Sequence, residues 1–148
     1  MTDSPTPGQG QSNPAIVIIF GASGDLTQRK LIPALYTLYA EGRLGEQFAV
    51  VGVARSDFSA DQKDPAEGFR GHLKDMALKN ARVNDKAGAK WKAFAEHLHY
   101  CQGEYDAADT YQRLTELLAD LDSRFDTVGN RLFYLSTPPQ LYQVIVEQ

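Results

Sequence analysis

The sequence has few of the residues that cross-link or metal sites require. Its 148 residues include one cysteine, Cys101, and three histidines. A single cysteine cannot form an internal disulfide, so a disulfide-stabilised secreted domain is not expected. His97 and His99 form an H-x-H pair, but no third ligand stands at suitable spacing, and we predict no metal site.

Long apolar runs and an excess of positive charge are also missing. No apolar stretch approaches the roughly 18 residues of a membrane-spanning helix. The first residues show no basic segment followed by an apolar core, as a secretory signal would. The formal net charge is -4, without a basic stripe, which argues against nucleic acid or an anionic membrane surface as partner. We therefore expect a cytoplasmic protein.

The beginning of the chain differs in composition from the rest. Residues 1–14 are rich in proline, glycine, serine and glutamine, which predicts a disordered leader. Hydrophobic residues make up 43% of the whole chain, enough for a buried core. We expect one domain over residues 15–148.

The rest of the sequence alternates between strand and helix patterns. Strands are predicted at 15–20, 48–54, 98–102 and 130–136 from apolar runs and alternation. A helix is predicted from about 31 to Gly42 or Gly45, after a short turn at 26–30. A polar helical region interrupted by Pro65 is predicted from Ser59 or Asp61 to about Asn80. Further helices are predicted at 86–97, at 108–125 with Asp106 as cap, and from Pro138 or Pro139 onward. This order predicts an α/β fold: a Rossmann-like, doubly wound open parallel sheet with helices on both faces.

The turn after the first strand, "FGASGDL", contains two glycines. Gly21 permits a sharp turn, Gly24 lacks a Cβ that would block a pyrophosphate, and the helix that follows offers free N–H groups. The spacing is not the usual G-x-G-x-x-G, since Thr27 stands in place of a third glycine, and no Walker G-K-[ST] follows. Two interpretations remain open: a phosphate cradle, or a plain strand-to-helix turn.

The residues after the second strand bear on the choice of coenzyme. In NAD-binding sheets an acidic residue there holds the ribose hydroxyls, whereas an arginine accommodates the 2′-phosphate of NADP. Here Arg55 and Ser56 come first and Asp57 follows. A guanidinium forks onto phosphate oxygens and a serine adds a donor. Taken alone, Arg55 is explained equally well as a solvated surface arginine or as a phosphate ligand. Together with the glycine turn, the pattern favours NADP over NAD.

Three blocks of sequence resemble one known family. The blocks "FGASGDLTQRKLIPALYTLYAEGRL", "VVGVARS" and "RLFYLSTPPQLY" occur in the order and with gaps similar to those of the N-terminal coenzyme domain of glucose-6-phosphate dehydrogenases. The resemblance covers about residues 15–148. It implies an NADP-dependent oxidoreductase that oxidises glucose 6-phosphate to 6-phosphogluconolactone in the pentose phosphate pathway, and a homo-oligomer when complete.

The resemblance also implies roles for individual residues. The glycine turn would wrap the coenzyme pyrophosphate, with Ser23 and Arg55 at the 2′-phosphate. The segment after the third strand would lie near the adenine, and the "PPQLY" segment would border the nicotinamide. The residues expected to bind the coenzyme are Gly21, Ala22, Ser23, Gly24, Asp25, Leu26, Thr27, Gln28, Arg55, Ser56, Glu104, Tyr105, Pro138 and Tyr142.

Two motifs of the family do not occur in this sequence. Family members continue into an "EKP" segment and then a segment with the histidine that acts as base. We therefore expect a domain truncated at its C-terminal end, with no catalytic residue and no activity by itself. The alternative is a stand-alone NADP-binding or sensing module without catalysis.

Overall fold

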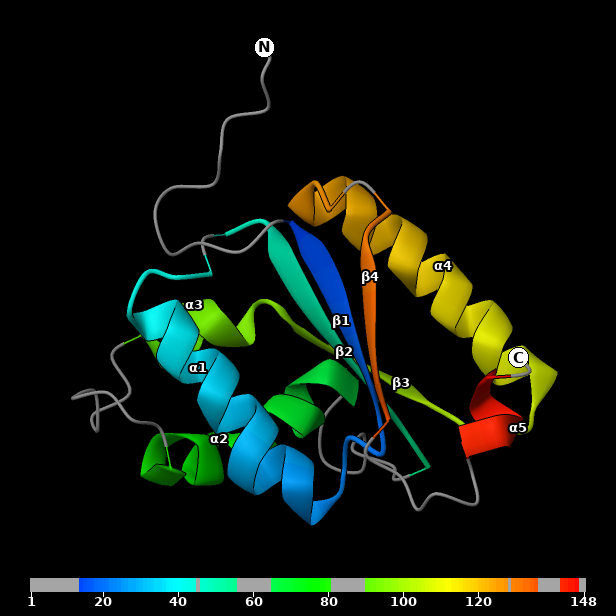
Figure 1. Ribbon diagram of the computed structural model, residues 1–148, viewed down its shortest axis with the longest axis horizontal. Coiled ribbons are helices and arrows are strands. Elements are labelled where there is room, and N and C mark those ends of the chain that lie inside the picture. Colours follow the sequence, from blue (N-terminus) through cyan, green and yellow to red (C-terminus); the bar gives the residue numbers. More distant parts are fainter. Residues whose placement is uncertain are drawn as a thin grey trace, which may run out of the picture.

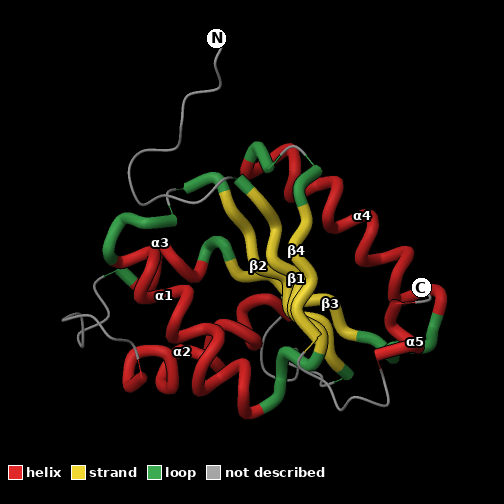
Figure 2. Tube along the Cα trace, viewed as in Figure 1, coloured by secondary structure: helices red, strands yellow, loops and turns green. Residues whose placement is uncertain are grey.

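The computed structural model contains one open sheet of four parallel strands (Figures 1 and 2). It describes residues 14–44, 46–55, 65–80, 90–127, 129–135 and 142–146. The strands are β1 (Ala15–Phe20), β2 (Phe48–Ala54), β3 (Leu98–Gln102) and β4 (Arg131–Leu135), in the order β3-β2-β1-β4. This arrangement confirms the predicted parallel sheet. The leader predicted at residues 1–14 lies, except for Pro14, outside the described residues.

Helices cover both faces of the sheet (Figure 1). One face carries the π-helix η1 (Thr27–Leu31), α1 (Ile32–Ala40), α2 (Pro65–Asn80) and α3 (Trp91–Ala95), and the other carries α4 (Ala108–Phe125) and α5 (Tyr142–Val146). Because side chains alternate along a strand, Ile19 packs into a core with the first set of helices, while Ile18 packs into a second core with α4. None of the helices in the described ranges has the length and hydropathy needed to cross a membrane.

The helix after β1 differs from the predicted short turn followed by a separate helix. It is continuous from Asp25, with a π-turn over Thr27–Leu31 that leads directly into α1. The backbone N–H of Ile32 bonds to the carbonyl of Thr27, five residues back. Pro33 follows inside this continuous helix, where it has no N–H to donate to the carbonyl of Arg29 four residues back, and the π-turn coincides with this missing bond. Gly42, with φ 76°, ends α1 as predicted, while Gly45 lies outside the described residues.

Two other predicted helix boundaries were wrong. Ala107, not Asp106, is the N-cap of α4, and no side chain caps this helix. A backbone turn takes the place of a cap, since the N–H of Ala107 bonds to the carbonyl of Glu104. Within the predicted helix 86–97, only Trp91–Ala95 is described as helical, and a turn at Glu96 and His97 precedes β3.

The remaining boundaries agree with the predictions where they are described. The fourth strand is one residue shorter than predicted at its start, and Ser136 lies outside the described residues. The segments 56–64 and 81–89, and the two prolines predicted to begin the last helix, also lie outside them.

Gly52 in the middle of β2 allows α2 and the glycine turn to approach the sheet. A Cβ at this position would lie 2.5 Å from Cζ of Phe69 and 2.7 Å from Cβ of Ala22. Gly52→Ala is therefore expected to lower the free energy of unfolding by about 1–3 kcal/mol, as overpacking does. Urea denaturation measures the change.

Gly71 provides the matched control for this prediction. It lies on the exposed side of α2, and a Cβ there would meet no atom within 4 Å. Gly71→Ala should raise the free energy of unfolding by about 0.5–1 kcal/mol, because alanine favours a helix interior. Equal stability of the two variants would contradict the packing argument at Gly52.

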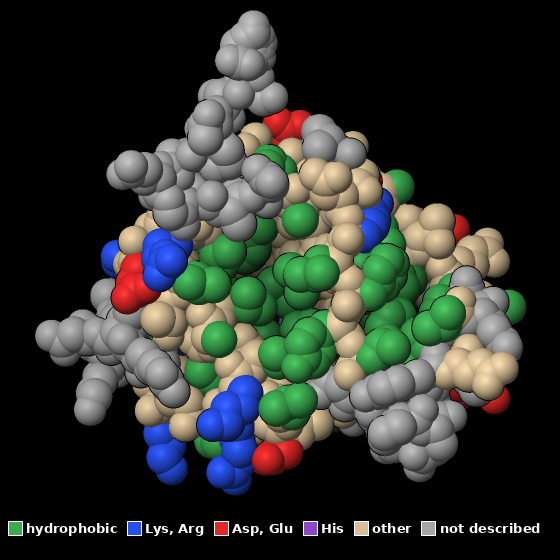
Figure 3. All heavy atoms as spheres, viewed as in Figure 1, with side chains coloured by type: hydrophobic (Ala, Val, Ile, Leu, Met, Phe, Trp, Pro, Cys, Tyr) green, Lys and Arg blue, Asp and Glu red, His purple; other side chains and the backbone are tan. Residues whose placement is uncertain are grey.

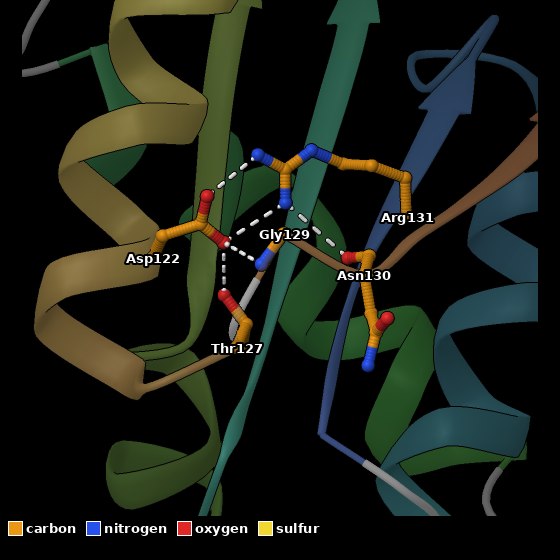
Figure 4. A network of polar contacts seen from close by, with 5 residues as sticks. All are labelled: Asp122, Thr127, Gly129, Asn130 and Arg131. Atoms are coloured by element: carbon orange, nitrogen blue, oxygen red, sulfur yellow. Dashed lines mark hydrogen bonds and ion pairs between the residues drawn. The ribbon is translucent and has the colours of Figure 1, made fainter.

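A polar network joins the end of α4 to the start of β4 (Figure 4). The Asp122 carboxylate accepts two hydrogen bonds from the Arg131 guanidinium, at 2.9 and 2.7 Å. It also accepts bonds from the Thr127 hydroxyl and the Gly129 N–H. The hydrogen bonds from Arg131 and Thr127 hold the pKa of Asp122 well below its usual range. The network therefore fixes the turn that places β4 beside β1.

The depressed pKa of Asp122 predicts a pH-dependent contribution to stability. Asp122→Asn should lower the free energy of unfolding by about 1.5–3 kcal/mol at neutral pH, since it removes charge-assisted bonds. The contribution is fully present above the unfolded pKa of about 3.9 and is lost as the pH falls toward the folded pKa. Urea titrations from pH 7 to below pH 4 should show the two proteins converging.

Asp120 supplies the control for this titration. Its carboxylate pairs with Arg124 at 3.5 Å on the exposed surface of α4. Such exposed pairs contribute little, so Asp120→Asn should change stability by less than about 1 kcal/mol at any pH. A difference between wild type and Asp122→Asn that stays constant down to pH 2 would contradict the assignment.

The outer edge of β4 is apolar and exposed. Leu132, Phe133 and Tyr134 are 59%, 57% and 40% exposed. Figure 3 shows hydrophobic side chains on both sides of the band where β4 lies in Figure 1. On the α4 side, Phe133 and Leu135 line an apolar groove of about 340 Å³. Among the described strands β4 pairs only with β1, so it is an edge strand of the described sheet.

Candidate functional site

The glycine turn lies at the carboxyl end of β1, at the lower end of the sheet in Figure 1. Gly21 has a φ of 85°, a left-handed conformation that glycine adopts without strain. The N–H groups of Gly21 and Ala22 both donate to the carbonyl of Val53, at 2.9 and 3.3 Å. The turn is thus attached to the end of the neighbouring strand β2.

Gly24 serves a different purpose from Gly21. Its φ lies outside the left-handed region, so its backbone conformation does not require glycine. Among the described residues, a Cβ at Gly24 would meet the carbonyl oxygen of Gly21, at a tight 3.2 Å, and no other atom within 4 Å. The helix begins at the next residue, and the first N–H groups of a helix have no carbonyl partner within it. The missing side chain therefore leaves space beside an anion-attracting helix end.

Side chains within the turn support it from the inside. Thr27 is fully buried, and its hydroxyl donates to the carbonyl of Gly21 at 3.3 Å. The Gln28 side chain donates to the carbonyl of Ser23 at 3.4 Å. Thr27 stands in place of the last glycine of the G-x-G-x-x-G pattern, and its hydroxyl stabilises the turn.

The other predicted residues of the turn differ in exposure. Ala22 is fully buried, whereas Leu26 is 44% exposed. Asp25 is exposed, and its carboxylate pairs with the guanidinium of Arg29 one turn later. This pair offsets the negative charge that Asp25 would otherwise bring to an anion site.

Arg55 lies at the same end of the sheet as the glycine turn. It is the first residue after β2, and Val53 pairs in register with Phe20, the last residue of β1. The Arg55 side chain is exposed. Within the described residues, no hydrogen bond or ion pair holds its guanidinium, which is free to take an anion. Ser56 lies outside the described residues.

The two residues predicted near the adenine differ in exposure. Glu104 is exposed, whereas Tyr105 is 8% exposed and packs against Phe20, with ring centroids 6.2 Å apart. The Tyr105 hydroxyl donates to the carbonyl of Val53 at 3.4 Å. Burial raises the pKa of Tyr105, opposed by the backbone of Gly21 and the charge of Arg55. Tyr105 therefore packs beneath the turn, and its contact with an adenine stays a prediction.

The remaining site predictions fall largely outside the described residues. Pro138 lies outside them, and Tyr142 begins α5. None of the three histidines lies at the carboxyl end of the sheet. His72 is exposed on α2, His97 is buried just before β3, and His99 is buried within it. In the part of the chain that the structure describes, no three His, Cys, Asp or Glu side chains form a group that could hold a metal.

Sequence reasoning missed the contribution of Gln102 and Gly103 at the end of β3. The Gln102 side chain donates to the carbonyl of Arg55 at 3.2 Å, and the Gly103 N–H donates to the carbonyl of Ala54 at 2.9 Å. A Cβ at Gly103 would collide with the side chain of Thr110. The signal in the sequence is a polar residue followed by glycine at the end of an otherwise buried strand.

Comparisons with known proteins were made for the sequence and for the fold. The family model described as "Glucose-6-phosphate dehydrogenase, NAD binding domain" matches residues 18–148. Glucose-6-phosphate 1-dehydrogenase of Chlamydia pneumoniae is 45% identical over 136 residues, covering 90% of this chain and 25% of the relative. Glucose-6-phosphate 1-dehydrogenase of Aggregatibacter actinomycetemcomitans is 46% identical over 132 residues, covering 88% of this chain and 25% of the relative. The chain thus spans about a quarter of the length of the curated relatives that it matches.

Solved structures agree with this assignment. A glucose-6-phosphate dehydrogenase in complex with its substrate glucose-6-phosphate superposes with a TM-score of 0.72 and 32% identity, covering 91% of this chain and 26% of that chain. The glucose-6-phosphate 1-dehydrogenase from Mycobacterium avium superposes with a TM-score of 0.63 and 28% sequence identity. The match covers 90% of this chain and 26% of that chain. The strand order, the glycine turn and the matched length lead to one conclusion. The chain belongs to the glucose-6-phosphate dehydrogenase family, of which it carries the domain that binds a nicotinamide dinucleotide.

Proposed function

We propose that this domain binds NADP, with the pyrophosphate at the glycine turn and the 2′-phosphate at Arg55. The observation that carries the proposal is Gly24, whose φ lies outside the left-handed region and which directly precedes the helix start. Among the described residues, a Cβ there would crowd the carbonyl oxygen of Gly21, at 3.2 Å, and would reach into the space beside the helix start. A ligand that approaches the start of the helix accounts for the absence of a Cβ. The Arg55 guanidinium, at the end of the neighbouring strand, has no hydrogen bond or ion pair among the described residues, and this supports NADP over NAD.

We further propose that the domain serves glucose-6-phosphate oxidation in a longer protein. A bound NADP would supply the acceptor for the hydride that leaves C1 of glucose 6-phosphate as the sugar is oxidised to the lactone. The hydroxyl proton must go to a base, and no histidine of this chain lies at the carboxyl end of the sheet. The role of the chain's own residues is therefore to bind and orient the coenzyme. From the resemblance we also propose that the protein is cytoplasmic, acts in the pentose phosphate pathway and forms a homo-oligomer.

Calorimetric titration with NADP and NAD in one buffer tests the proposed binding. We expect NADP to bind at least about 10-fold more tightly, since charge-assisted hydrogen bonds hold the 2′-phosphate. The fragments 2′,5′-ADP and 5′-AMP, which differ only in the 2′-phosphate, should show the same preference. Equal affinities for the two coenzymes would contradict the assignment of NADP, and binding of neither would contradict the cradle.

The oxidation is tested in a chimaera in which this chain replaces the matching quarter of the Chlamydia pneumoniae relative. NADPH formation that depends on glucose 6-phosphate is the expected result. A chimaera that binds NADP and glucose 6-phosphate but produces no NADPH would contradict the proposed reaction.

A further inference from the structure

Three consecutive carbonyl groups at the end of β2 are bound by one short segment. The carbonyls of Val53, Ala54 and Arg55 accept hydrogen bonds from the Tyr105 hydroxyl, the Gly103 N–H and the Gln102 side chain, in that order. We call residues 102–105 the clamp segment. It fixes the backbone from which Arg55 projects.

Gln102 extends the hydrogen-bond ladder of the sheet by one step. In register, Gln102 pairs with Ala54, the last residue of β2. Beyond it, the Gly103 N–H still donates to the carbonyl of Ala54, but no backbone N–H of the described residues donates to the next carbonyl, that of Arg55. The side-chain amide of Gln102 takes this place and donates to the carbonyl of Arg55 at 3.2 Å. Gln102 is also the one exposed residue of β3, so apolar packing does not account for its side chain.

The hydrogen bond from Gln102 holds the backbone carbonyl of the residue that carries the guanidinium. The side chain itself is exposed and, among the described residues, has no hydrogen bond or ion pair. A long flexible side chain loses rotamer entropy when it binds a phosphate, and a fixed backbone origin limits that loss. The side-chain hydrogen bond from Gln102 is made one residue beyond the last pair of the ladder, to the backbone carbonyl of Arg55 itself.

We infer that Gln102 is a positioning residue for Arg55 and thereby contributes to the preference for the 2′-phosphate. The inference rests on the proposed NADP function. Gln102 acts on the backbone of Arg55 and is not assigned a contact with the coenzyme. Its effect should therefore concern NADP alone, because NAD lacks the phosphate that Arg55 is proposed to hold.

The test is a calorimetric comparison of Gln102→Ala with the unmodified chain. We expect affinity for NADP to fall about 2- to 10-fold, as for one neutral hydrogen bond, while affinity for NAD stays unchanged. Gln112→Ala is the matched control, since Gln112 is an exposed glutamine on α4. Circular dichroism and urea denaturation establish that each variant is folded.

A double-mutant cycle with Arg55→Ala separates positioning from a structural role. If Gln102 acts through Arg55, Gln102→Ala should have no effect on NADP affinity in the Arg55→Ala background. An equal loss in both backgrounds, an equal loss for NADP and NAD, or no loss in either would overturn the inference. If Arg55→Ala itself leaves the ratio of the two affinities unchanged, the proposed NADP preference fails instead.

Discussion

Gly24→Val is expected to abolish binding of both NADP and NAD while the domain stays folded. The branched side chain would occupy the space beside the helix start that the pyrophosphate needs. The fold should tolerate the change at a modest cost in stability, because the φ of Gly24 suits other residues. Among the described residues, the added Cβ would lie 3.2 Å from the carbonyl oxygen of Gly21, which has to shift by a few tenths of an ångström. Titration calorimetry with both coenzymes measures the result.

Gly24→Ala provides a graded control. A single methyl group should weaken both coenzymes by a similar factor and less than valine does, since it fills less of the space. Circular dichroism must show that both variants are folded. A folded Gly24→Val protein with the parent affinity for NADP would remove the phosphate cradle from this assignment.

Most of the sheet could be predicted because β1, β2 and β3 are largely buried. Every residue of β2 is buried, so the strand reads as a continuous apolar run, which is typical of a parallel sheet. The glycine turn could also be located, since Gly21 follows such a run directly. The different reasons for Gly21 and Gly24 could not be predicted, because they depend on φ and on which atoms surround each residue.

The contacts between strand ends required the register of the sheet. Gln102 and Arg55 are 47 positions apart in sequence, and only the pairing of β2 with β3 brings them together. The burial of Tyr105 likewise depends on α4 and β1, which pack around it. The cap of α4 was mispredicted because Asp106 has the chemistry of a cap, whereas a backbone turn supplies the bond.

Arg55→Ala is expected to lower the affinity for NADP about 10- to 150-fold and to leave NAD nearly unchanged. One charge-assisted hydrogen bond to the 2′-phosphate contributes about 1.5–3 kcal/mol, which corresponds to this range. The effect should be confined to NADP, because Arg55 follows β2, whereas the N–H groups that would face the pyrophosphate begin the helix after β1. Calorimetric titration with the two coenzymes, and with 2′,5′-ADP, measures the change.

Arg43→Ala separates a local contact from the loss of one positive charge. Arg43 is exposed and precedes β2, so it lies toward the opposite end of the sheet, 4.0 Å from the Glu41 carboxylate. Its removal should leave both affinities unchanged, because exposed charges more than about 10 Å apart are screened at 0.1 M salt. Arg55→Lys should fall between wild type and Arg55→Ala, since lysine keeps the charge but lacks the planar fork. Equal losses of NADP and NAD in Arg55→Ala would assign Arg55 to the pyrophosphate or to folding instead.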